Sequence, residues 1–171
     1  MIGTVQKSAA DYFYVSLSDY TSNATLPQLA FEMASKKTRP QLNPGALVYA
    51  RVTMANRHMD PELECVSSST GKADGLGPLV GGMLYPISQG MARRLLMRKS
   101  VEEGRVVVLE ELGAAGAAFE TAVGRNGKVW VNSENVKTVL AVGRALQETD
   151  EQHLSVDAQK KLVRKLIKEL S

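Results

Sequence analysis

The sequence predicts an α+β protein in which a small five-stranded barrel of the OB-fold type is followed by a βααββα unit and a C-terminal helix. Apolar and polar residues alternate through much of the first half, and apolar residues recur at helical spacing through much of the second half. Between the two patterns, residues 71–84 contain five glycines and one proline, a composition typical of a connector. We therefore predict a barrel at residues 1–67, a glycine-rich junction at 68–82 and a second domain at 83–171.

Composition narrows the class of protein. The chain has 171 residues, a hydrophobic fraction of 44% and a formal net charge of +3, which fits one globular domain or two small ones. Residues 1–77 carry seven basic and seven acidic side chains, whereas residues 155–171 carry five basic and two acidic ones. Because the positive charge is concentrated at the end, the chain is not a uniformly basic nucleic-acid coat. Any RNA contact must come from local clusters.

Cysteine usage and hydropathy indicate the compartment. Cys65 is the single cysteine, so no internal disulfide can form, as is usual in a reducing compartment. No apolar run is long enough to span a bilayer, and the first residues do not resemble a signal peptide. We therefore expect no membrane association and a location in the nucleus or the cytoplasm.

The first half contains five strand patterns. Residues 12–17 alternate, with Phe13, Val15 and Leu17 on one face, which is the period of a half-buried strand. The other strand candidates are residues 2–7, 24–26, 46–54 and 62–66. Five short strands close most economically into a barrel, because closure removes the exposed sheet edges.

A basic cluster lies between Phe31 and Pro44. This polar segment contains Lys36, Lys37 and Arg39, which either form a solvated loop or contact phosphates at the open end of an oligonucleotide-binding barrel. The candidate RNA-binding residues are Lys36, Lys37, Arg39, Arg57 and His58. For His58 the commoner alternative is a turn residue that faces solvent.

Two tyrosines of the first half have aromatic rings that could contact RNA bases. Tyr12 and Tyr14 lie on the face of the predicted strand opposite to Phe13. They could stack on bases, or they could pack against the second half of the chain.

The second domain begins with a strand and two helices. Residues 83–87 form a short strand, in which Pro86 indicates a sheet edge or a strand end. Ser88 can cap a helix that runs to residue 96. Residues 100–103 read Ser-Val-Glu-Glu, a capping box, so we predict a second helix from there through 105–109 that ends between Gly113 and Gly116. The β-branched residues at 106–108 would also suit a strand.

A hairpin and a third helix follow. Residues 119–123 and 128–132 are strand patterns around Gly124, Arg125, Asn126 and Gly127, and Asn-Gly is a strong hairpin signal that commonly needs positive φ at both residues. Ser133 is the predicted cap of a helix with one apolar side, formed by Val136, Val139, Leu140 and Leu146. The order strand, helix, helix, strand, strand, helix is that of a eukaryotic-type KH domain.

The usual RNA clamp of a KH domain is missing from this sequence. A KH domain that binds nucleic acid carries GXXG between its first two helices. Here that joint, residues 97–100, reads Met-Arg-Lys-Ser and contains no glycine. The GxxG at 124–127 falls in the predicted hairpin, where a structural turn is the better interpretation. Trp130 next to it is predicted to be a buried anchor.

The chain ends in an amphipathic helix. Its apolar side is formed by Leu162, Val163, Leu166, Ile167 and Leu170. Its other faces carry Lys160, Lys161, Arg164, Lys165 and Lys168. We favour a terminal helix docked on the domain with solvated lysines over a helix that binds a partner or RNA.

The sequence contains no convincing motif of a catalytic site. His58 and His153 are far apart and, with Cys65, give no zinc-ligand spacing. Gly71-Lys72 lacks the upstream glycine of a phosphate-binding P-loop, and no close pair of carboxylates falls in a predicted cleft. We therefore predict no catalytic residues, no metal site and no cofactor.

Several motifs together resemble the ribosomal RNA-processing protein forty family, which are non-catalytic cap subunits of the eukaryotic RNA exosome. The motifs are LAF at 29–31, RP at 39–40, LVYARV at 47–52, MDPEL at 59–63, GLGPL at 75–79, GGML at 81–84, ARRLL at 92–96, FE at 119–120 and GRNGKVW at 124–130. The resemblance covers nearly the whole chain, and the glycine-rich junction favours this family over the sister cap proteins.

The resemblance implies a function and partners. It implies an S1-type barrel joined to a KH domain, assembly with RNase PH-like ring subunits and other cap subunits, and RNA threaded toward a separate nuclease for 3′–5′ processing and decay. It implies a structural role for the GxNG motif at 124–127, at the contact between barrel and KH domain. The implied location is the nucleus, including the nucleolus, and the cytoplasm.

Three points stay open at this stage. The family usually has a further β-rich N-terminal domain, so the sequence could be a fragment. The alternative function is a free-standing RNA-binding protein of the translation-factor type. A ribonuclease in its own right is a third, weaker hypothesis.

Overall fold

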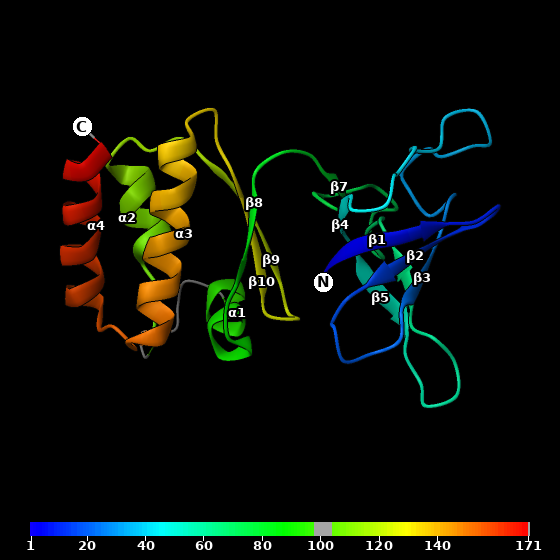
Figure 1. Cartoon of the computed structure of the whole chain (residues 1–171), viewed down its shortest axis with the longest axis horizontal. Helices are drawn as coiled ribbons and strands as arrows, with labels where there is room; N and C mark the ends of the chain where they lie inside the picture. Colours follow the sequence, from blue (N-terminus) through cyan, green and yellow to red (C-terminus); the bar gives the residue numbers. More distant parts are fainter. Residues whose placement is uncertain (98–103, 171) are drawn as a thin grey trace. The chain divides into compact units, whose positions relative to one another are not determined.

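The computed structural model describes residues 1–97 and 104–170 and divides the chain into two compact units, Met1–Val80 and Gly81–Ser171 (Figure 1). The first unit is built from strands, and the second combines a sheet with helices. Among the described residues, none of the helices combines the length and the apolar character needed to cross a membrane.

The first unit is a curled sheet of seven strands. Their bounds are β1 (Ile2–Ser8), β2 (Tyr12–Ser16), β3 (Ala24–Pro27), β4 (Leu47–Tyr49), β5 (Arg51–Met54), β6 (Glu62–Glu64) and β7 (Gly77–Leu79). The order across the sheet is β5-β6-β3-β2-β1-β4-β7. All five strand patterns of the first half therefore form strands.

One predicted strand, residues 46–54, is divided in two. The backbone leaves the ladder at Ala50, where the N-terminal amine of Met1 donates to the Ala50 carbonyl over 2.8 Å. Before this break β4 pairs with β1, and after it β5 pairs with β6. Because one bent segment supplies strands near both ends of the sheet order, the sheet curls back on itself as a small barrel does.

The glycine-rich junction is partly strand, which corrects its interpretation as a pure connector. Gly77–Leu79 form β7 and pair with β4, with Pro78 opposite Val48. Proline has no N–H for the ladder, but β7 is the last strand in the sheet order, where one side needs no partner. An edge position thus lets a Gly-Pro segment join the sheet.

Side chains of alternate strand positions form the core of the first unit. Phe13, Val15, Leu26, Val48 and Leu63 are all at most 2% exposed. Phe31 packs edge to face on Phe13, with 6.4 Å between ring centroids, and holds the segment after β3 against this core.

The second unit has the predicted βααββα order followed by a C-terminal helix. Its elements are β8 (Met83–Pro86), α1 (Gln89–Leu96), α2 (Val108–Ala114), β9 (Glu120–Gly124), β10 (Lys128–Asn132), α3 (Val136–Glu151) and α4 (Val156–Leu170). The antiparallel sheet has the order β8-β10-β9, so β8, which ends at Pro86, is an edge strand as predicted. Helices α2, α3 and α4 stack on one side of this sheet (Figure 1).

Ser88 caps α1 as predicted and also connects two helices. Its Oγ accepts from the Met91 N–H over 3.0 Å and donates to Asp150 Oδ1 over 2.6 Å, while its backbone N–H donates to Asp150 Oδ2 over 2.6 Å. Asp150 belongs to the last turn of α3 and is 9% exposed. A buried carboxylate is therefore satisfied at the N-terminus of α1, where the helix dipole favours negative charge.

The start of the second helix differs from the prediction. The capping box at 100–103 lies outside the described residues, and α2 begins only at Val108. The Val107 N–H donates to Gln159 Oε1 over 2.7 Å, and Gln159 Nε2 donates to the Arg105 carbonyl over 3.1 Å. Because the buried Gln159 side chain of α4 forms hydrogen bonds with these two backbone groups, the segment 105–107 is held outside the helix.

The cap and the buried face of α3 also differ from the prediction. Asn135, not Ser133, caps the helix by accepting from the Lys137 N–H over 2.9 Å. Ser133 Oγ instead donates to the Ala118 carbonyl over 2.7 Å. Val136 and Leu140, predicted on the apolar side, are 66% and 50% exposed. The buried side is formed by Val139, Val142, Ala145 and Leu146.

The β9–β10 hairpin forms where the Asn-Gly signal predicts it, with a different turn. Gly124 pairs with Lys128, which leaves a three-residue loop, and the Gly127 N–H donates to the Gly124 carbonyl over 3.1 Å. Among the three loop residues only Gly127 has a positive φ, of 76°. This is the arrangement of a type I turn followed by a left-handed glycine, which needs one positive φ and not two.

Trp130 is buried as predicted and is tied to the end of the glycine-rich segment. Its side chain is 6% exposed, and its Nε1 donates to the Gly81 carbonyl over 2.8 Å. A Cβ at Gly82 would lie 2.4 Å from the Val131 carbonyl oxygen and 2.9 Å from Trp130 Nε1. The absence of a side chain at Gly82 therefore allows the backbone to pass directly over β10.

Candidate nucleic-acid interface

The basic loop of the first unit is a compact turn held by its own hydroxyl groups. Ser35 Oγ and Thr38 Oγ1 lie 2.9 Å apart, and Thr38 Oγ1 also donates to the Met33 carbonyl over 3.1 Å. The Arg39 N–H donates to the Ser35 carbonyl over 2.9 Å. Lys36 and Lys37 are exposed at the tip of this turn, so the loop presents its cations on a short, internally bonded support.

Gln28 fixes the turn between β1 and β2 to the end of β3. Its side chain is only 6% exposed, and Nε2 donates to the Ala9 carbonyl over 2.6 Å. Its backbone N–H donates to the Asp11 carbonyl over 2.9 Å. These bonds hold residues 9–11 beside the start of the segment that leads to the basic loop.

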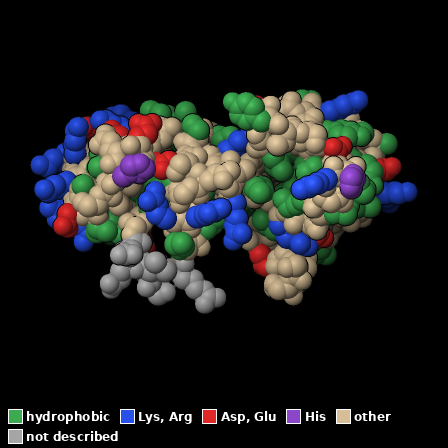
Figure 2. Space-filling view, turned by 90° about the horizontal axis from the view of Figure 1, so that it is seen from below, with side chains coloured by type: hydrophobic (Ala, Val, Ile, Leu, Met, Phe, Trp, Pro, Cys, Tyr) green, Lys and Arg blue, Asp and Glu red, His purple; other side chains and the backbone are tan. Residues whose placement is uncertain are grey.

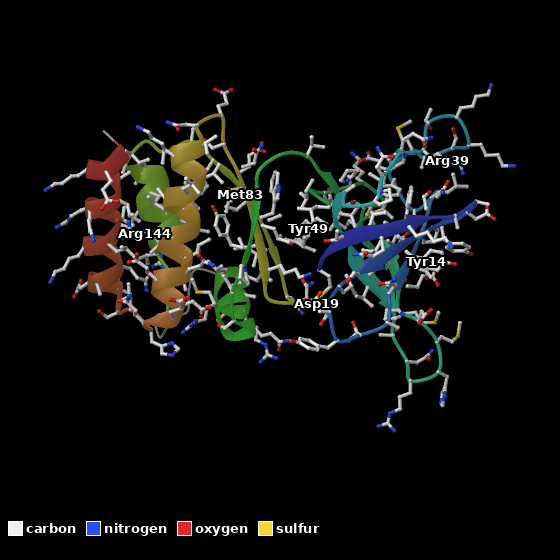
Figure 3. The ribbon with its side chains drawn as sticks, in the orientation of Figure 1. Tyr14, Asp19, Arg39, Tyr49, Met83 and Arg144 are labelled. Atoms are coloured by element: carbon white, nitrogen blue, oxygen red, sulfur yellow. The ribbon has the colours of Figure 1, made fainter. Side chains whose placement is uncertain are left out.

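These pieces enclose a pocket of about 450 Å³ at one end of the barrel. Its lining residues are Ala10, Asp11, Tyr12, Pro27, Gln28, Leu29, Lys36 and Arg39. Tyr12 and Leu29 are 44% and 52% exposed. Arg39 crosses to the opposite wall, where its Nη1 donates to the Ala10 carbonyl over 3.3 Å. Figure 3 shows Arg39 at the base of the loop that extends from this end of the barrel.

The pocket combines the groups that a single-stranded nucleic acid uses. An exposed Tyr12 ring offers a face on which a base can stack, while Lys36 and Arg39 can meet phosphates. Asp11 is the only acid in the lining, and its carboxylate can accept from an amino group of a base. The volume lies within the range typical of pockets for small ligands.

The structure separates the predicted RNA-binding residues into two groups. Lys36 and Arg39 line the pocket, and Lys37 sits beside them at the loop tip without lining it. Arg57 and His58 lie in the exposed loop between β5 and β6. Figure 1 shows this loop and the loop at 33–39 extending from opposite ends of the barrel.

Strand register confirms this separation. Tyr12 pairs with Pro27 at the pocket end of β3, whereas the other end of β3 is joined to the residues that follow the β5–β6 loop. There Thr25 pairs with Glu62, and its N–H donates to the Pro61 carbonyl over 2.8 Å. Within its loop, the His58 N–H donates to Asn56 Oδ1 over 2.9 Å.

Sequence reasoning missed five of the lining residues, Ala10, Asp11, Pro27, Gln28 and Leu29. A signal for them was present, because in an antiparallel pair the start of β2 and the end of β3 must lie at the same end of the sheet. Tyr14, the second tyrosine considered for stacking, is half-buried and does not line the pocket.

The GxNG turn at Gly124, Arg125, Asn126 and Gly127 is joined to the end of β8. The Ile87 N–H donates to the Gly127 carbonyl over 2.9 Å, and a Cβ at Gly127 would lie 2.7 Å from the Ile87 carbonyl oxygen. The turn is thus a packing element of the second unit. Its predicted role in a contact with the barrel stays a prediction.

Comparison with known proteins identifies the family. The family described as exosome complex component RRP40, S1 domain, matches residues 1–77, and a KH domain family matches residues 82–137. The chain is 40% identical over 171 residues to the Schizosaccharomyces pombe exosome complex component rrp40, covering 99% of this chain and 67% of that protein.

The chain belongs to the Rrp40 family.

Other relatives agree with this assignment. Identity to the Rrp40 family member of Saccharomyces cerevisiae is 38% over 148 residues, covering 86% of this chain and 59% of that protein. Identity to the human exosome complex component RRP40 is 30% over 168 residues, covering 97% and 57%. The chain therefore spans between 57% and 67% of the length of these Rrp40 proteins.

A solved structure shows the same fold. A crystal structure of a protein provisionally assigned as an exosome complex RNA-binding protein aligns with a TM-score of 0.70 and 22% identity, covering 99% of this chain and 91% of that one. Together with the two family matches, this likeness confirms the predicted S1-type barrel and KH-type domain.

Proposed function

We propose that this Rrp40-family chain serves as a non-catalytic RNA-binding cap subunit of the RNA exosome. It guides RNA to the central channel for 3′–5′ processing and decay and stabilises the RNase PH-like ring. The observation that carries the proposal is the pocket of the S1-type barrel, in which Tyr12, Lys36 and Arg39 come together. We also propose that the protein is located in the nucleus, including the nucleolus, and in the cytoplasm.

The pocket suits transient binding of many sequences. Stacking on Tyr12 accepts any base, because every base has a π-face, and contacts of Lys36 and Arg39 with phosphates carry no sequence information. Few contacts are available, so each RNA segment can be released and replaced by the next. A guiding surface needs this property, since the RNA has to move past it.

Binding of labelled oligouridylate by the purified chain tests the pocket. Tyr12→Ala should weaken binding by roughly fivefold or more, because stacking on one aromatic side chain contributes about 1–3 kcal/mol per base. Arg39→Gln should lower the slope of log K against log salt by about 0.7, the value for one phosphate of a single strand. Filter binding between about 50 mM and about 200 mM KCl measures both quantities.

Two matched variants sharpen this test. Arg57→Gln removes one cation at the other end of the barrel, and Lys72→Gln removes an exposed cation of the same unit that does not line the pocket. Both should bind like the unchanged chain. If Arg57→Gln weakens binding and Tyr12→Ala does not, RNA binds at the β5–β6 loop and the pocket assignment is wrong.

Co-elution with RNase PH-like ring subunits in gel filtration tests the assembly part of the proposal. We expect the chain to join the ring and to leave labelled RNA at full length in the presence of divalent metal. Elution apart from the ring with RNA still bound would support the free-standing RNA-binding alternative. Shortening of RNA that disappears on a point mutation in this chain would contradict the non-catalytic role.

A further inference from the structure

The outward face of α4 carries a stripe of four cations. Lys161 lies three and four residues before Arg164 and Lys165, and Lys168 lies four and three residues after them, which places all four on one side of the helix. All four are exposed, whereas Leu162, Val163 and Leu166 on the other side are buried. Figure 2 shows Lys and Arg side chains gathered over the end of the second unit that α4 forms in Figure 1. We call these four residues the α4 stripe.

The stripe is not neutralised within the described part of the chain. Glu169 and Glu111, two acids near it, are already engaged, with Arg144 over 3.2 Å and with Lys160 over 3.9 Å. Among residues 1–97 and 104–170, none of the four stripe cations forms an ion pair. Like charges three and four positions apart repel one another and disfavour the helix. A bound polyanion would remove this repulsion.

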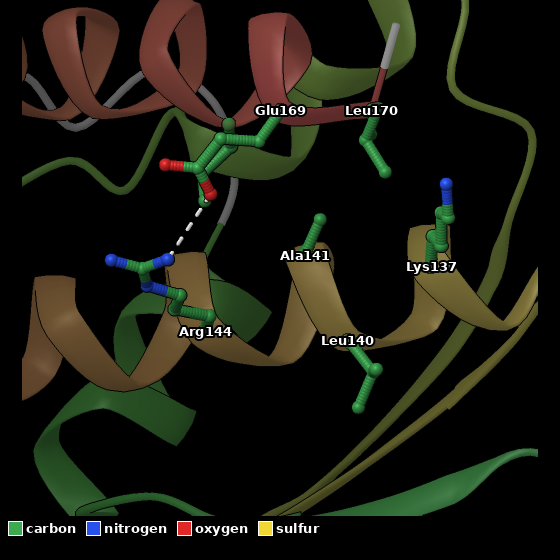
Figure 4. Close-up of a pocket in the computed structure, with 7 residues that line it drawn as sticks. Lys137, Leu140, Ala141, Arg144, Glu169 and Leu170 are labelled. Atoms are coloured by element: carbon green, nitrogen blue, oxygen red, sulfur yellow. Dashed lines mark hydrogen bonds and ion pairs between the residues drawn. The ribbon is translucent and has the colours of Figure 1, made fainter.

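The apolar groove beside α4 does not include the α4 stripe. A groove of about 180 Å³ follows the seam between α3 and α4, lined by Lys137, Leu140, Ala141, Arg144, Leu166, Glu169 and Leu170 (Figure 4). Of these residues none belongs to the α4 stripe. A partner that covers the stripe therefore meets charge without an apolar anchor. Protein interfaces depend on buried apolar or aromatic anchors, whereas nucleic-acid backbones are bound by charge alone.

We infer that α4 carries a second RNA contact, in which the α4 stripe binds phosphates of the backbone without reading the bases. Lys161 and Lys168 are separated by about 10 Å along the helix axis at 1.5 Å per residue, a length that allows contact with about two phosphates of a single strand. This contact goes beyond the barrel pocket and does not depend on it.

The test compares two variants of the whole chain that lose the same charge. In the stripe variant, Lys161→Gln, Arg164→Gln, Lys165→Gln and Lys168→Gln remove the stripe with a residue that suits helices. In the control variant, Lys7→Gln, Lys72→Gln, Lys128→Gln and Lys137→Gln remove four cations spread over the rest of the molecule. Circular dichroism checks that the helix content of both is unchanged.

Filter binding of an oligouridylate of about 20 nucleotides gives the readout. If the stripe holds about two phosphates, its loss lowers the salt slope by about 1.4, so the unchanged chain loses about sevenfold more affinity than the stripe variant between about 50 mM and about 200 mM KCl. The control variant should keep a slope close to that of the unchanged chain. The exchange of Arg164→Lys with Lys165→Arg keeps the charge and should keep the binding.

Two results would overturn the inference. Equal binding by the stripe and control variants would show that only net charge matters. Displacement of the RNA by polyglutamate as effectively as by unlabelled RNA would show a site for acidic proteins. Crosslinking with RNA that contains 4-thiouridine gives an independent measurement, because the inference requires crosslinks within residues 160–168.

The barrel variant Tyr12→Ala, measured in parallel, separates this inference from the proposed function. A loss with Tyr12→Ala alone supports the pocket and overturns the second contact. A loss with the stripe variant alone supports the second contact and contradicts the pocket.

Discussion

Cys65 shows how burial sets the chemistry of one side chain. Its thiol is 1% exposed in the barrel core, and burial, reinforced by the nearby Glu64 carboxylate, raises its pKa from 9.0 to about 12. The thiol therefore stays protonated in the folded chain at pH values where an unfolded chain would carry a thiolate. We expect slow reaction with alkylating reagents until the barrel unfolds.

The raised pKa of Cys65 predicts a loss of stability at alkaline pH. Below about pH 9 both states keep the proton, so the thiol contributes nothing to the pH dependence. Between about pH 9 and 12 the unfolded chain loses the proton and the folded chain does not, so the free energy of unfolding falls by up to about 1.4 kcal/mol per pH unit. Urea unfolding at several pH values gives the slope of the free energy of unfolding against pH for the unchanged chain and for Cys65→Ala. The difference between the two slopes is the contribution of the thiol. Identical slopes would contradict it.

Gly127 is predicted to be required for two separate reasons. Its φ of 76° is strained for other residues, and a Cβ would lie 2.7 Å from the Ile87 carbonyl oxygen. Gly116, with a φ of 91° and nothing within 4 Å of a Cβ, shares only the first reason. Gly116→Ala should lower the free energy of unfolding by roughly 1 kcal/mol, and Gly127→Ala by clearly more. Thermal unfolding compares them, and equal losses would remove the steric part of the argument.

At the scale of elements, α3 packs closely on β8 because Gly143 has no side chain. A Cβ at Gly143 would lie 2.1 Å from the Tyr85 ring, whose hydroxyl donates to the Val139 carbonyl over 3.2 Å. Burial also raises the pKa of Tyr85. The glycine therefore lets an aromatic ring lie directly against the helix backbone.

A pair of glycine substitutions tests this packing. Gly143→Ala should destabilise the second unit by about 1–3 kcal/mol, as overpacking does, although alanine favours helices. In α2, Gly113 has nothing within 4 Å of a Cβ, so Gly113→Ala should stabilise by about 0.5–1 kcal/mol. Chemical denaturation followed by circular dichroism measures both. The same sign for the two variants would show that propensity, and not packing, decides at Gly143.

Local patterns predicted the elements that depend on local interactions. Alternation located the strand around Phe13, and the short-range signals located the cap at Ser88 and the hairpin at Gly127. The prediction was wrong where distant residues decide. Gln159 holds residues 105–107 outside α2 from more than 50 positions away, and the barrel bends its strand at Ala50 because each half has a different partner.

The candidate site was predictable in part for the same reason. Composition indicated the cations Lys36 and Arg39, and alternation placed the Tyr12 ring on an outward face. The sequence pattern could not show that Arg57 and His58 lie at the other end of the barrel, because their position follows from the register of β3 with β6. The pattern also gave no indication of Gln28, whose hydrogen bonds to the β1–β2 turn shape the pocket.

At the scale of the whole molecule, two hydrophobic cores share no residue. One contains Phe13 and Leu63 and belongs to the barrel, and the other contains Leu146 and Leu166 and belongs to the second unit. Hydrophobic stabilisation comes from contacts within a core. Each unit therefore has its own source of stability.

Separate cores predict a local response to core truncation. Leu63→Ala, at a residue that is 1% exposed, should destabilise the barrel by about 2–5 kcal/mol. Amide hydrogen exchange in the full chain should then accelerate within residues 1–80 and leave α3 protected. Equal acceleration in both units would show that they unfold as one cooperative body.

The Trp130 bond to Gly81 has a practical consequence for following such events. Trp130 is the single tryptophan of the chain, and its buried indole is held at the start of the second unit, while Tyr12, Tyr14, Tyr20 and Tyr49 all lie in the first. Fluorescence excited at a wavelength that only indole absorbs therefore reports on the KH-type unit and not on the barrel. Release of the Gly81 bond exposes the indole to water and shifts its emission to longer wavelength. The chain therefore carries its own optical probe of the opening of the KH-type unit.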